Sequence, residues 1–111
     1  CPESCAPAAY RANLSSEHAR NTRLTSAFSG RPARGIVNEL IRFCDGADTP
    51  VPPDYPIAYD AAKQLHAAAS AQGNHAFAAH WAGQGATRAR ELPAAELVAL
   101  LADELRRYNA Y

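Results

Sequence analysis

Methionine is absent from this sequence of 111 residues, tryptophan occurs once, and neither sign of charge is in excess. Eleven basic residues match eleven acidic ones, so no long-range field would attract nucleic acid or an anionic membrane surface. No stretch approaches the roughly 20 apolar residues that a membrane-spanning helix needs. We therefore expect neither nucleic acid nor a membrane as a partner, and a cytoplasmic location fits this composition best.

Cysteine is scarce, and Cys1, Cys5 and Cys44 make an odd number. Cys1 and Cys5 have no second pair and no nearby histidines to complete a zinc site, so we expect free thiols and no metal. The chain also begins with cysteine and lacks methionine, which is not typical of a complete reading frame. We therefore expect a piece of a longer protein. We expect no retained secretory signal, because the first residues include neither a basic nor an apolar signal region.

Prolines and glycines divide the chain into helical segments, because proline is tolerated in a first turn and glycine ends a helix. The predicted helices begin at Pro7 and fray near Ser15, run from Pro32 to Gly46, run from Pro56 to about Gln72, and follow Pro93, with a short helical turn broken by Gly83 and Gly85. Residues 22–28 alternate as one strand, which has no predicted partner and suggests a sheet outside the chain. The fold expected of the chain as it stands is mainly α.

The segment "YPIAYDAAK" places Tyr55, Tyr59 and Lys63 four residues apart at a predicted helix. On a period of 3.6 residues their polar ends form one gently turning row, so all three could face one small ligand. A boundary between core and solvent is the alternative, because tyrosine and lysine often bury their stems and keep their ends in water. Spacing alone leaves both interpretations open.

Other polar residues give weaker signals. Arg31 and Arg34 lie at a predicted helix start in "SGRPARG", where an anion could bind. Arginines at such a place are more commonly solvated, or paired here with Glu39 and Asp45. The four histidines form no HExxH or HxxxH pair and no Ser/His/Asp order, so none of them is singled out.

Together these stretches resemble the C-terminal part of the bacterial nitronate monooxygenases, the FMN enzymes once called 2-nitropropane dioxygenases. The match is in order and nearly continuous through "CPES", "LTSAFSGRPARGIVN", "PPDYPIAYDAAKQLHAAA" and "HWAGQGATRARELPAAELV". "FSGRPARG" and "WAGQG" are specific signals, since neither composition nor helix physics demands them. The resemblance implies an α/β fold, a (β/α)8 TIM barrel flavoenzyme with an added helical domain, of which residues 1–111 would be a single C-terminal fragment.

The resemblance also implies an activity and its residues. In the family, FMN lies at the C-terminal ends of the strands, and alkyl nitronates are oxidised with O2 to a carbonyl compound and nitrite. Residues 1–30 would be the end of the barrel plus an extension, and residues 31–111 a helical segment lining the active site. The substrate-binding residues that the family's Tyr-x3-Tyr-x3-Lys row implies are Tyr55, Tyr59 and Lys63, whose donors suit a small anion. The cofactor-binding residues implied by the family's loop near FMN are Trp81, Gly83 and Gln84.

Some parts of the family pattern do not occur in this chain. The segment with the catalytic base and the glycine-rich strand ends that hold the FMN phosphate lie upstream of Cys1 in the family. We therefore expect no catalytic residue here, the remainder of its own barrel as a partner, and no reaction by the chain alone. Two alternatives stay open: a non-catalytic helical interaction module that exposes the apolar faces at Ile36 and Leu97, and another FMN barrel oxidoreductase such as an enoyl reductase.

The isolated chain is expected to bind FMN weakly or not at all, because most of the FMN site is expected outside it. Titration of FMN with the purified chain, followed by flavin fluorescence, measures this affinity. Tight stoichiometric binding by these 111 residues would contradict the expectation that the FMN site needs residues upstream of Cys1.

Overall fold

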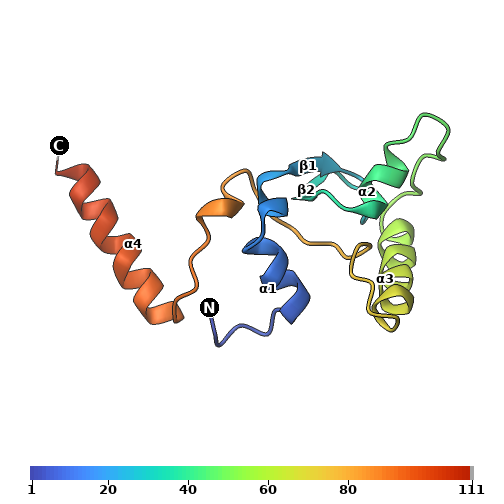
Figure 1. The fold of residues 1–111 in the computed structure, drawn as a ribbon. Helices are drawn as coiled ribbons and strands as arrows, with labels where there is room; N and C mark the ends of the chain where they lie inside the picture. Colours follow the sequence, from blue (N-terminus) through green and yellow to red (C-terminus); the bar gives the residue numbers. More distant parts are fainter. Residues whose placement is uncertain (111) are drawn as a thin grey trace.

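The computed structural model describes residues 1–110, which form four α-helices, two 3-10 turns and one two-stranded sheet (Figure 1). In chain order these are α1 (Ala8–Leu14), a 3-10 turn (Glu17–Arg20), β1 (Thr22–Thr25), β2 (Ala33–Ile36), α2 (Glu39–Cys44), α3 (Ile57–Ser70), a 3-10 turn (Ala86–Arg88) and α4 (Ala94–Asn109). The predicted helix starts at Pro7, Pro56 and Pro93 are confirmed, and the chain is mainly helical. Within the described residues, no helix is both long and apolar enough to cross a membrane.

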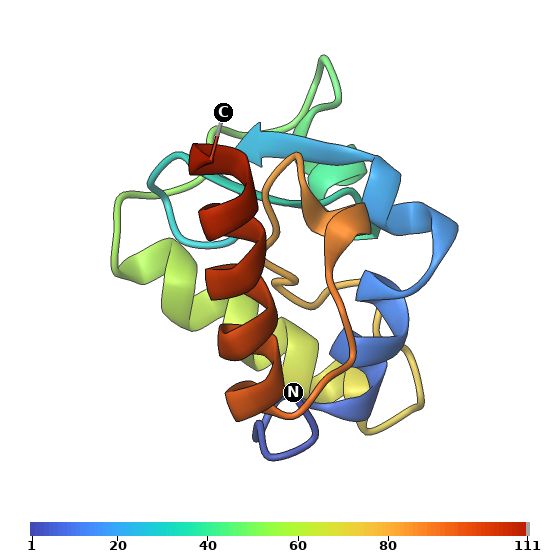
Figure 2. The same ribbon diagram turned by 90° about the vertical axis from the view of Figure 1, so that its left-hand side faces the viewer.

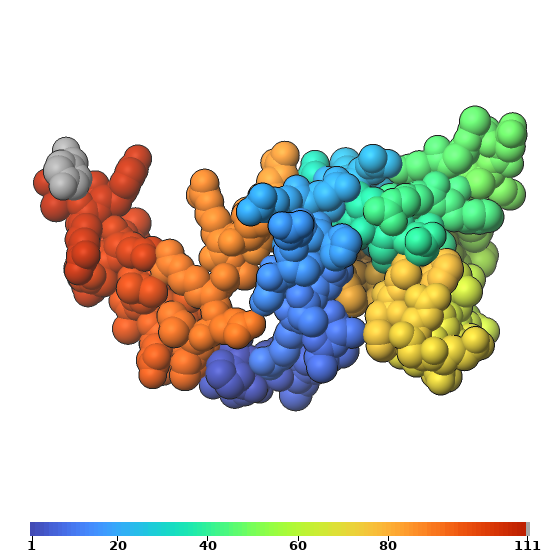
Figure 3. All heavy atoms as spheres, viewed as in Figure 1, coloured from blue at the N-terminus to red at the C-terminus, as the bar shows by residue number. Residues whose placement is uncertain are grey.

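The molecule is elongated, with principal extents of 53 × 31 × 26 Å. α3 lies at one end and α4 at the other, with α1 and the β1–β2 hairpin between them (Figure 1). Figure 2 faces α4 and shows that its first turn lies beside the start of the chain. The spheres of Figure 3 show the rest of α4 standing apart from the body.

α4 is held at its first turn by a residue from the other end of the chain. Pro93 offers no side-chain acceptor to this helix, and the Glu3 carboxylate instead accepts a hydrogen bond from the Ala94 N–H at 2.5 Å. No residue of α4 is buried in residues 1–110. The large apolar side chains that it leaves exposed are Val98, Leu100, Leu101, Leu105 and Tyr108.

The helix predicted from Pro32 is wrong over its first part. β1 and β2 pair antiparallel, with Thr22 opposite Ile36 and Thr25 opposite Ala33. The strand that was expected to lack a partner therefore pairs with β2, a few residues further along the same chain. The reason is the demand of backbone N–H and C=O groups for partners, which this hairpin meets and a lone strand would not.

α2 begins later than predicted because Asn38 caps it. The Asn38 side-chain oxygen accepts a hydrogen bond from the Ile41 N–H at 3.2 Å, and asparagine is among the preferred residues at this position. The helix ends at Cys44, just before Gly46, as predicted. The apolar residues that suggested one long helical face therefore lie in two elements, the end of β2 and the short helix α2.

The predicted helical turn ahead of Gly83 is also wrong, because residues 75–78 form a non-helical turn and residues 79–82 then run extended beside β2. The His80 carbonyl accepts from the Ile36 N–H at 2.9 Å, and the Ala82 N–H donates to the Arg34 carbonyl at 3.2 Å. Gly35 permits this close approach, since a Cβ there would lie 3.1 Å from the His80 oxygen. The 3-10 turn Ala86–Arg88 follows the glycines instead.

The core consists of two small clusters that join the hairpin to its neighbours. The first contains Ala27, Phe28, Val37, Leu40 and Ile41, and the second contains Ala19, Ile36 and Ala86. α3 packs on the first cluster through Ala62, and Phe77 of the turn and Ala79 of the extended segment pack there as well. The core therefore fixes α3 and the extended segment on the same side of the hairpin.

Gly30 ties the hairpin to the connector that precedes α3. It has a positive φ of 87°, and a Cβ there would lie 2.5 Å from the Pro53 carbonyl oxygen and 2.6 Å from the Tyr55 nitrogen. Only glycine fits both this conformation and this spacing. Residues 53–55, which lead into α3, are consequently held against the hairpin.

Replacing Gly30 with alanine is expected to lower the free energy of unfolding by about 2 kcal/mol or more, because it adds a steric clash to the strain of a positive φ. Gly73→Ala is the matched control, since Gly73 has a φ of 76° but open space around a Cβ, and it should cost only about 1 kcal/mol. Urea denaturation followed by circular dichroism measures both. Equal losses in the two variants would show that the contact with the connector adds nothing.

Candidate functional site

The three residues of the predicted Tyr/Tyr/Lys row stay together in the structure. Tyr55 lies in the turn before α3, and Tyr59 and Lys63 follow on the helix. The ring centroids of Tyr55 and Tyr59 are 6.0 Å apart, and the Lys63 Nζ lies 5.1 Å from the Tyr59 centroid. Tyr55 is 45% and Tyr59 39% exposed, so these rings are neither buried in the core nor fully in solvent.

Tyr59 and Lys63 line a hollow of about 400 Å³ between α1, α3 and residues 75–81, which we call the α1–α3 hollow. Trp81 lines it as well, so one residue from the loop expected near FMN meets two from the row expected to bind substrate. The other lining residues are Pro7, Ala9, Tyr10, Phe28, Ala62, His66, Ser70, His75, Phe77, Ala78, Ala79 and His80.

The lining of the α1–α3 hollow contains a positive side chain and no carboxylate. Lys63 is the only lysine or arginine in its lining, which contains no aspartate or glutamate. Among residues 1–110, no ion pair within 4.0 Å involves Lys63. The ammonium group therefore lacks a protein counter-charge and is available to a bound anion.

The wall opposite α3 is built by Tyr10, Phe28, His80 and Trp81. The Tyr10 ring stacks on the His80 ring at 4.6 Å and 9°, and its hydroxyl donates to the Trp81 carbonyl. Phe28 meets the Trp81 ring edge-on at 5.1 Å. Burial raises the pKa of Tyr10, so its hydroxyl keeps its proton and the wall keeps this hydrogen bond.

His80 is held as a neutral imidazole. Its Nδ1 lies 2.9 Å from the Asn13 amide nitrogen, which can only donate, so the His80 Nδ1 accepts and its proton is on Nε2. Burial, followed by the nearby His66 and His75, lowers the pKa of His80. Protonation would turn Nδ1 into a donor and break the hydrogen bond to Asn13.

His66 is a lining residue that the sequence interpretation did not single out. Its Nδ1 is buried and has no hydrogen-bond partner among the described residues, and its ring lies 6.5 Å from that of His75. It follows Tyr59 and Lys63 at helical spacing, so the row could have been extended to it. No such signal exists for Tyr10 or His80, because they come from other segments.

Three of the predicted site residues do not line the α1–α3 hollow. Tyr55 borders it only through Tyr59, and Gly83 and Gln84 are exposed beyond Trp81. A Cβ at Gly83 would meet nothing within 4 Å. The assignment of Gly83 and Gln84 to FMN therefore stays a prediction.

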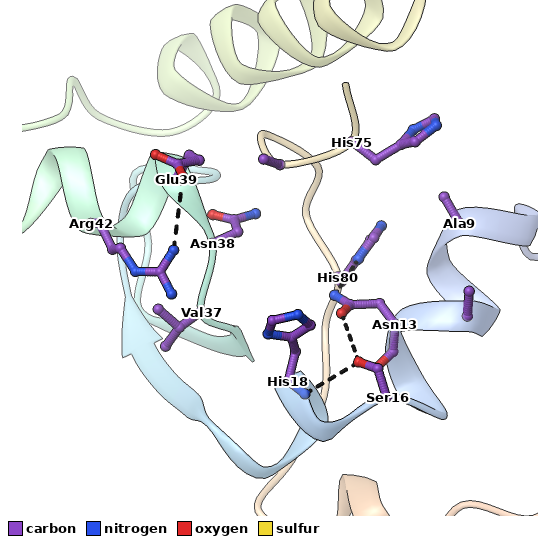
Figure 4. Close-up of a pocket in the computed structure, with 12 residues that line it drawn as sticks. Ala9, Asn13, Ser16, His18, Val37, Asn38, Glu39, Arg42, His75 and His80 are labelled. Carbon is purple, nitrogen blue, oxygen red and sulfur yellow. Dashed lines mark hydrogen bonds and ion pairs between the residues drawn. The ribbon is translucent and has the colours of Figure 1, made fainter. Parts of the chain in front are cut away.

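A second hollow of about 600 Å³ lies between α1, α2 and the extended segment, and it shares His75 and His80 with the first. Figure 4 shows His18 and Ser16 on one side of it, and Glu39 beside Arg42 on the other. The Glu39 carboxylate lies 4.0 Å from the Arg42 guanidinium, so these charges compensate each other. This hollow contains none of the predicted site residues, and the α1–α3 hollow is the better candidate.

Comparisons with known proteins agree on one family. A family model described as nitronate monooxygenase matches residues 1–104. A nitronate monooxygenase of Pseudomonas aeruginosa is 58% identical over 108 residues, which cover 96% of this chain and 30% of that protein. A nitronate monooxygenase of Paraburkholderia phytofirmans is 50% identical over 106 residues, which cover 96% of this chain and 29% of that protein. A solved structure of nitroalkane oxidase from Streptomyces ansochromogenes is similar with a TM-score of 0.85 and 41% identity, over 97% of this chain and 30% of that one. The chain thus spans less than a third of these relatives.

The lowered pKa of His80 predicts a pH dependence of stability. The unfolded chain, with a histidine pKa of about 6.5, binds a proton more readily than the folded one, so stability falls as pH drops through that value. The urea midpoint should be lower at about pH 5.5 than at about pH 7.5, and His80→Asn, which keeps an acceptor near Nδ1, should narrow this difference. If the urea midpoints at the two pH values differ as much in His80→Asn as in the unmodified chain, His80 is not the cause of this pH dependence.

Proposed function

The chain belongs to the nitronate monooxygenase family, and from this premise we propose that it forms one wall of the active site of an FMN-dependent enzyme. The enzyme would oxidise alkyl nitronates with O2 to a carbonyl compound and nitrite. Its proposed fold is a (β/α)8 barrel with an added helical domain. Residues 1–30 would form the end of the barrel plus an extension, and residues 31–111 the helical segment that lines the site.

The observation that carries this proposal is the single uncompensated cation of the α1–α3 hollow. Lys63 faces a lining of rings and small apolar groups without a carboxylate. A nitronate is a small anion whose charge is shared by two oxygens, and it therefore needs one positive charge and several hydrogen-bond donors. The ammonium of Lys63 and the phenol of Tyr59 supply that combination in the hollow, and we propose that the phenol of Tyr55, at its border, is a further donor.

Each part of the wall has a separate task in this proposal. Lys63 offsets the negative charge of the nitronate, and the Tyr59 hydroxyl donates to one of its oxygens. Phe28, Ala62 and Phe77 line the hollow with apolar surface that suits an alkyl group. Binding in this orientation holds the reacting carbon and excludes water from one side of it.

The residues present fit a wall for FMN, though not a complete FMN site. Trp81 offers an aromatic edge at the hollow, and the lining includes no cation other than Lys63 that could pair with the FMN phosphate. Electron transfer and the reaction with O2 are the chemistry that FMN supplies when it is bound. The phosphate-binding segment and the catalytic base are proposed to lie in the remainder of the barrel.

Exposed apolar side chains support a larger protein around this chain. Val98 is 66%, Leu105 60% and Tyr108 80% exposed on α4, and Ile57 and Leu65 are exposed on α3. Apolar faces of this kind normally pack on another surface. We propose that the remainder of its own barrel covers them. The proposed location of that protein is the cytoplasm.

The test uses a chimera in which this chain replaces the matching segment of the Pseudomonas aeruginosa nitronate monooxygenase. Lys63→Ala in this chimera should lower kcat/KM for an alkyl nitronate by about ten- to a hundredfold, because a charge-assisted interaction with the anion is lost. Nitrite release measures the rate. Gln64→Ala, on the same helix but outside the hollow, is the matched control and should retain activity.

Two outcomes would contradict the proposal. One is a folded, flavin-containing chimera that releases no nitrite from any alkyl nitronate. The other is a Lys63→Ala variant that is as active as the control, because the hollow would then have no part in binding the anion.

A further inference from the structure

The two phenols at the start of α3, Tyr55 in the preceding turn and Tyr59 on the helix, have a cation on each side. Arg31, from the turn between β1 and β2, places its guanidinium carbon 4.6 Å from the centroid of the Tyr55 ring. The Tyr55 and Tyr59 centroids are 6.0 Å apart, and the Lys63 Nζ is 5.1 Å from that of Tyr59. The order along the surface is therefore cation, phenol, phenol, cation, although Arg31 comes from a different element.

The turn that carries Arg31 is fixed in place. The Ser29 hydroxyl lies 3.3 Å from the Arg31 N–H, from which it accepts, and 3.2 Å from the Arg31 carbonyl, to which it donates. Next to it, Gly30 approaches so closely that a Cβ would lie 2.6 Å from the Tyr55 nitrogen. The backbone of Arg31 and the backbone of Tyr55 are thus held side by side by contacts that do not involve the guanidinium.

No ion pair within 4.0 Å involves Arg31 among residues 1–110, and its guanidinium instead lies over the face of the Tyr55 ring. A cation over a phenol is attracted by the ring face, and this attraction holds the two groups together. Arginine suits this role because its planar group stacks on aromatic faces. Tyr55 is 45% exposed. Its ring contacts the ring of Tyr59 on one side and the guanidinium of Arg31 on the other.

We propose that Arg31 is a positioning residue for anion binding, which holds the Tyr55 ring in line with Tyr59 at the border of the α1–α3 hollow. This inference rests on the proposed function, since it concerns the same anion. Arg31 does not line the α1–α3 hollow itself and acts through Tyr55. The row therefore has a cation on each side, but only Lys63 lines the hollow and can contact the anion directly.

The test compares Arg31→Gln and Arg31→Lys in the same chimera. Arg31→Gln should raise KM for an alkyl nitronate about three- to tenfold with kcat within about twofold, because it weakens binding of the anion and leaves the chemical step alone. Arg31→Lys, which keeps a cation near the ring, should restore most of the affinity. Arg106→Gln on α4 removes the same charge far from the row and is expected to leave KM unchanged.

A double-mutant comparison decides whether Arg31 acts through the ring. In a Tyr55→Leu background, which removes the aromatic face, Arg31→Gln should add less than about twofold to KM. An unchanged KM in Arg31→Gln, or an equal effect with and without the ring, would overturn the proposal. These outcomes are distinct from failure of the proposed function, which the unmodified chimera and its Lys63→Ala variant report.

Discussion

The site depends on one set of hydrogen bonds, those that join β2 and the nearby Asn38 side chain to residues 78–82. The Ile36 N–H donates to the His80 carbonyl and the Ala82 N–H to the Arg34 carbonyl, and the Asn38 side chain donates to the Ala78 carbonyl at 2.7 Å. These bonds fix the wall that bears His80 and Trp81 opposite α3. Without them Tyr59 and Lys63 would project from a helix with nothing facing them.

The chemical character of the hollow comes from an unequal distribution of charge in a neutral chain. Eleven acidic residues balance eleven basic ones overall, and the carboxylates that form ion pairs within 4.0 Å do so outside this hollow. Lys63 is left without such a partner beside half-exposed rings. Its attraction for an anion grows as water is excluded, because the effective dielectric constant falls. The wall would therefore become a strong anion site only when another surface closes it, which agrees with a chain that spans under a third of its relatives.

The helices were the most predictable part of the fold, and the hairpin was the least. α1, α3 and α4 begin just after prolines, and α3 and α4 have long periodic patterns, so local sequence was sufficient. The segment 32–38 combined a proline, a glycine and apolar residues at spacings that also fit a helix. Residues 33–36 form a strand because they pair with residues 22–25. Asn38 caps α2 and marks its start, and this cap could have been recognised from the sequence.

The sequence by itself determined the row of Tyr55, Tyr59 and Lys63, the likeness to one enzyme family, and the helix that carries Tyr59 and Lys63. These are local properties, set by spacing and by short specific motifs. The tertiary structure decided that Trp81 joins Tyr59 and Lys63 at one hollow, that Tyr10 and His80 support its far wall, and that Arg31 lies over Tyr55. Those partners are far apart along the chain, and only the pairing of β2 and the close approach at Gly30 bring them within reach of each other.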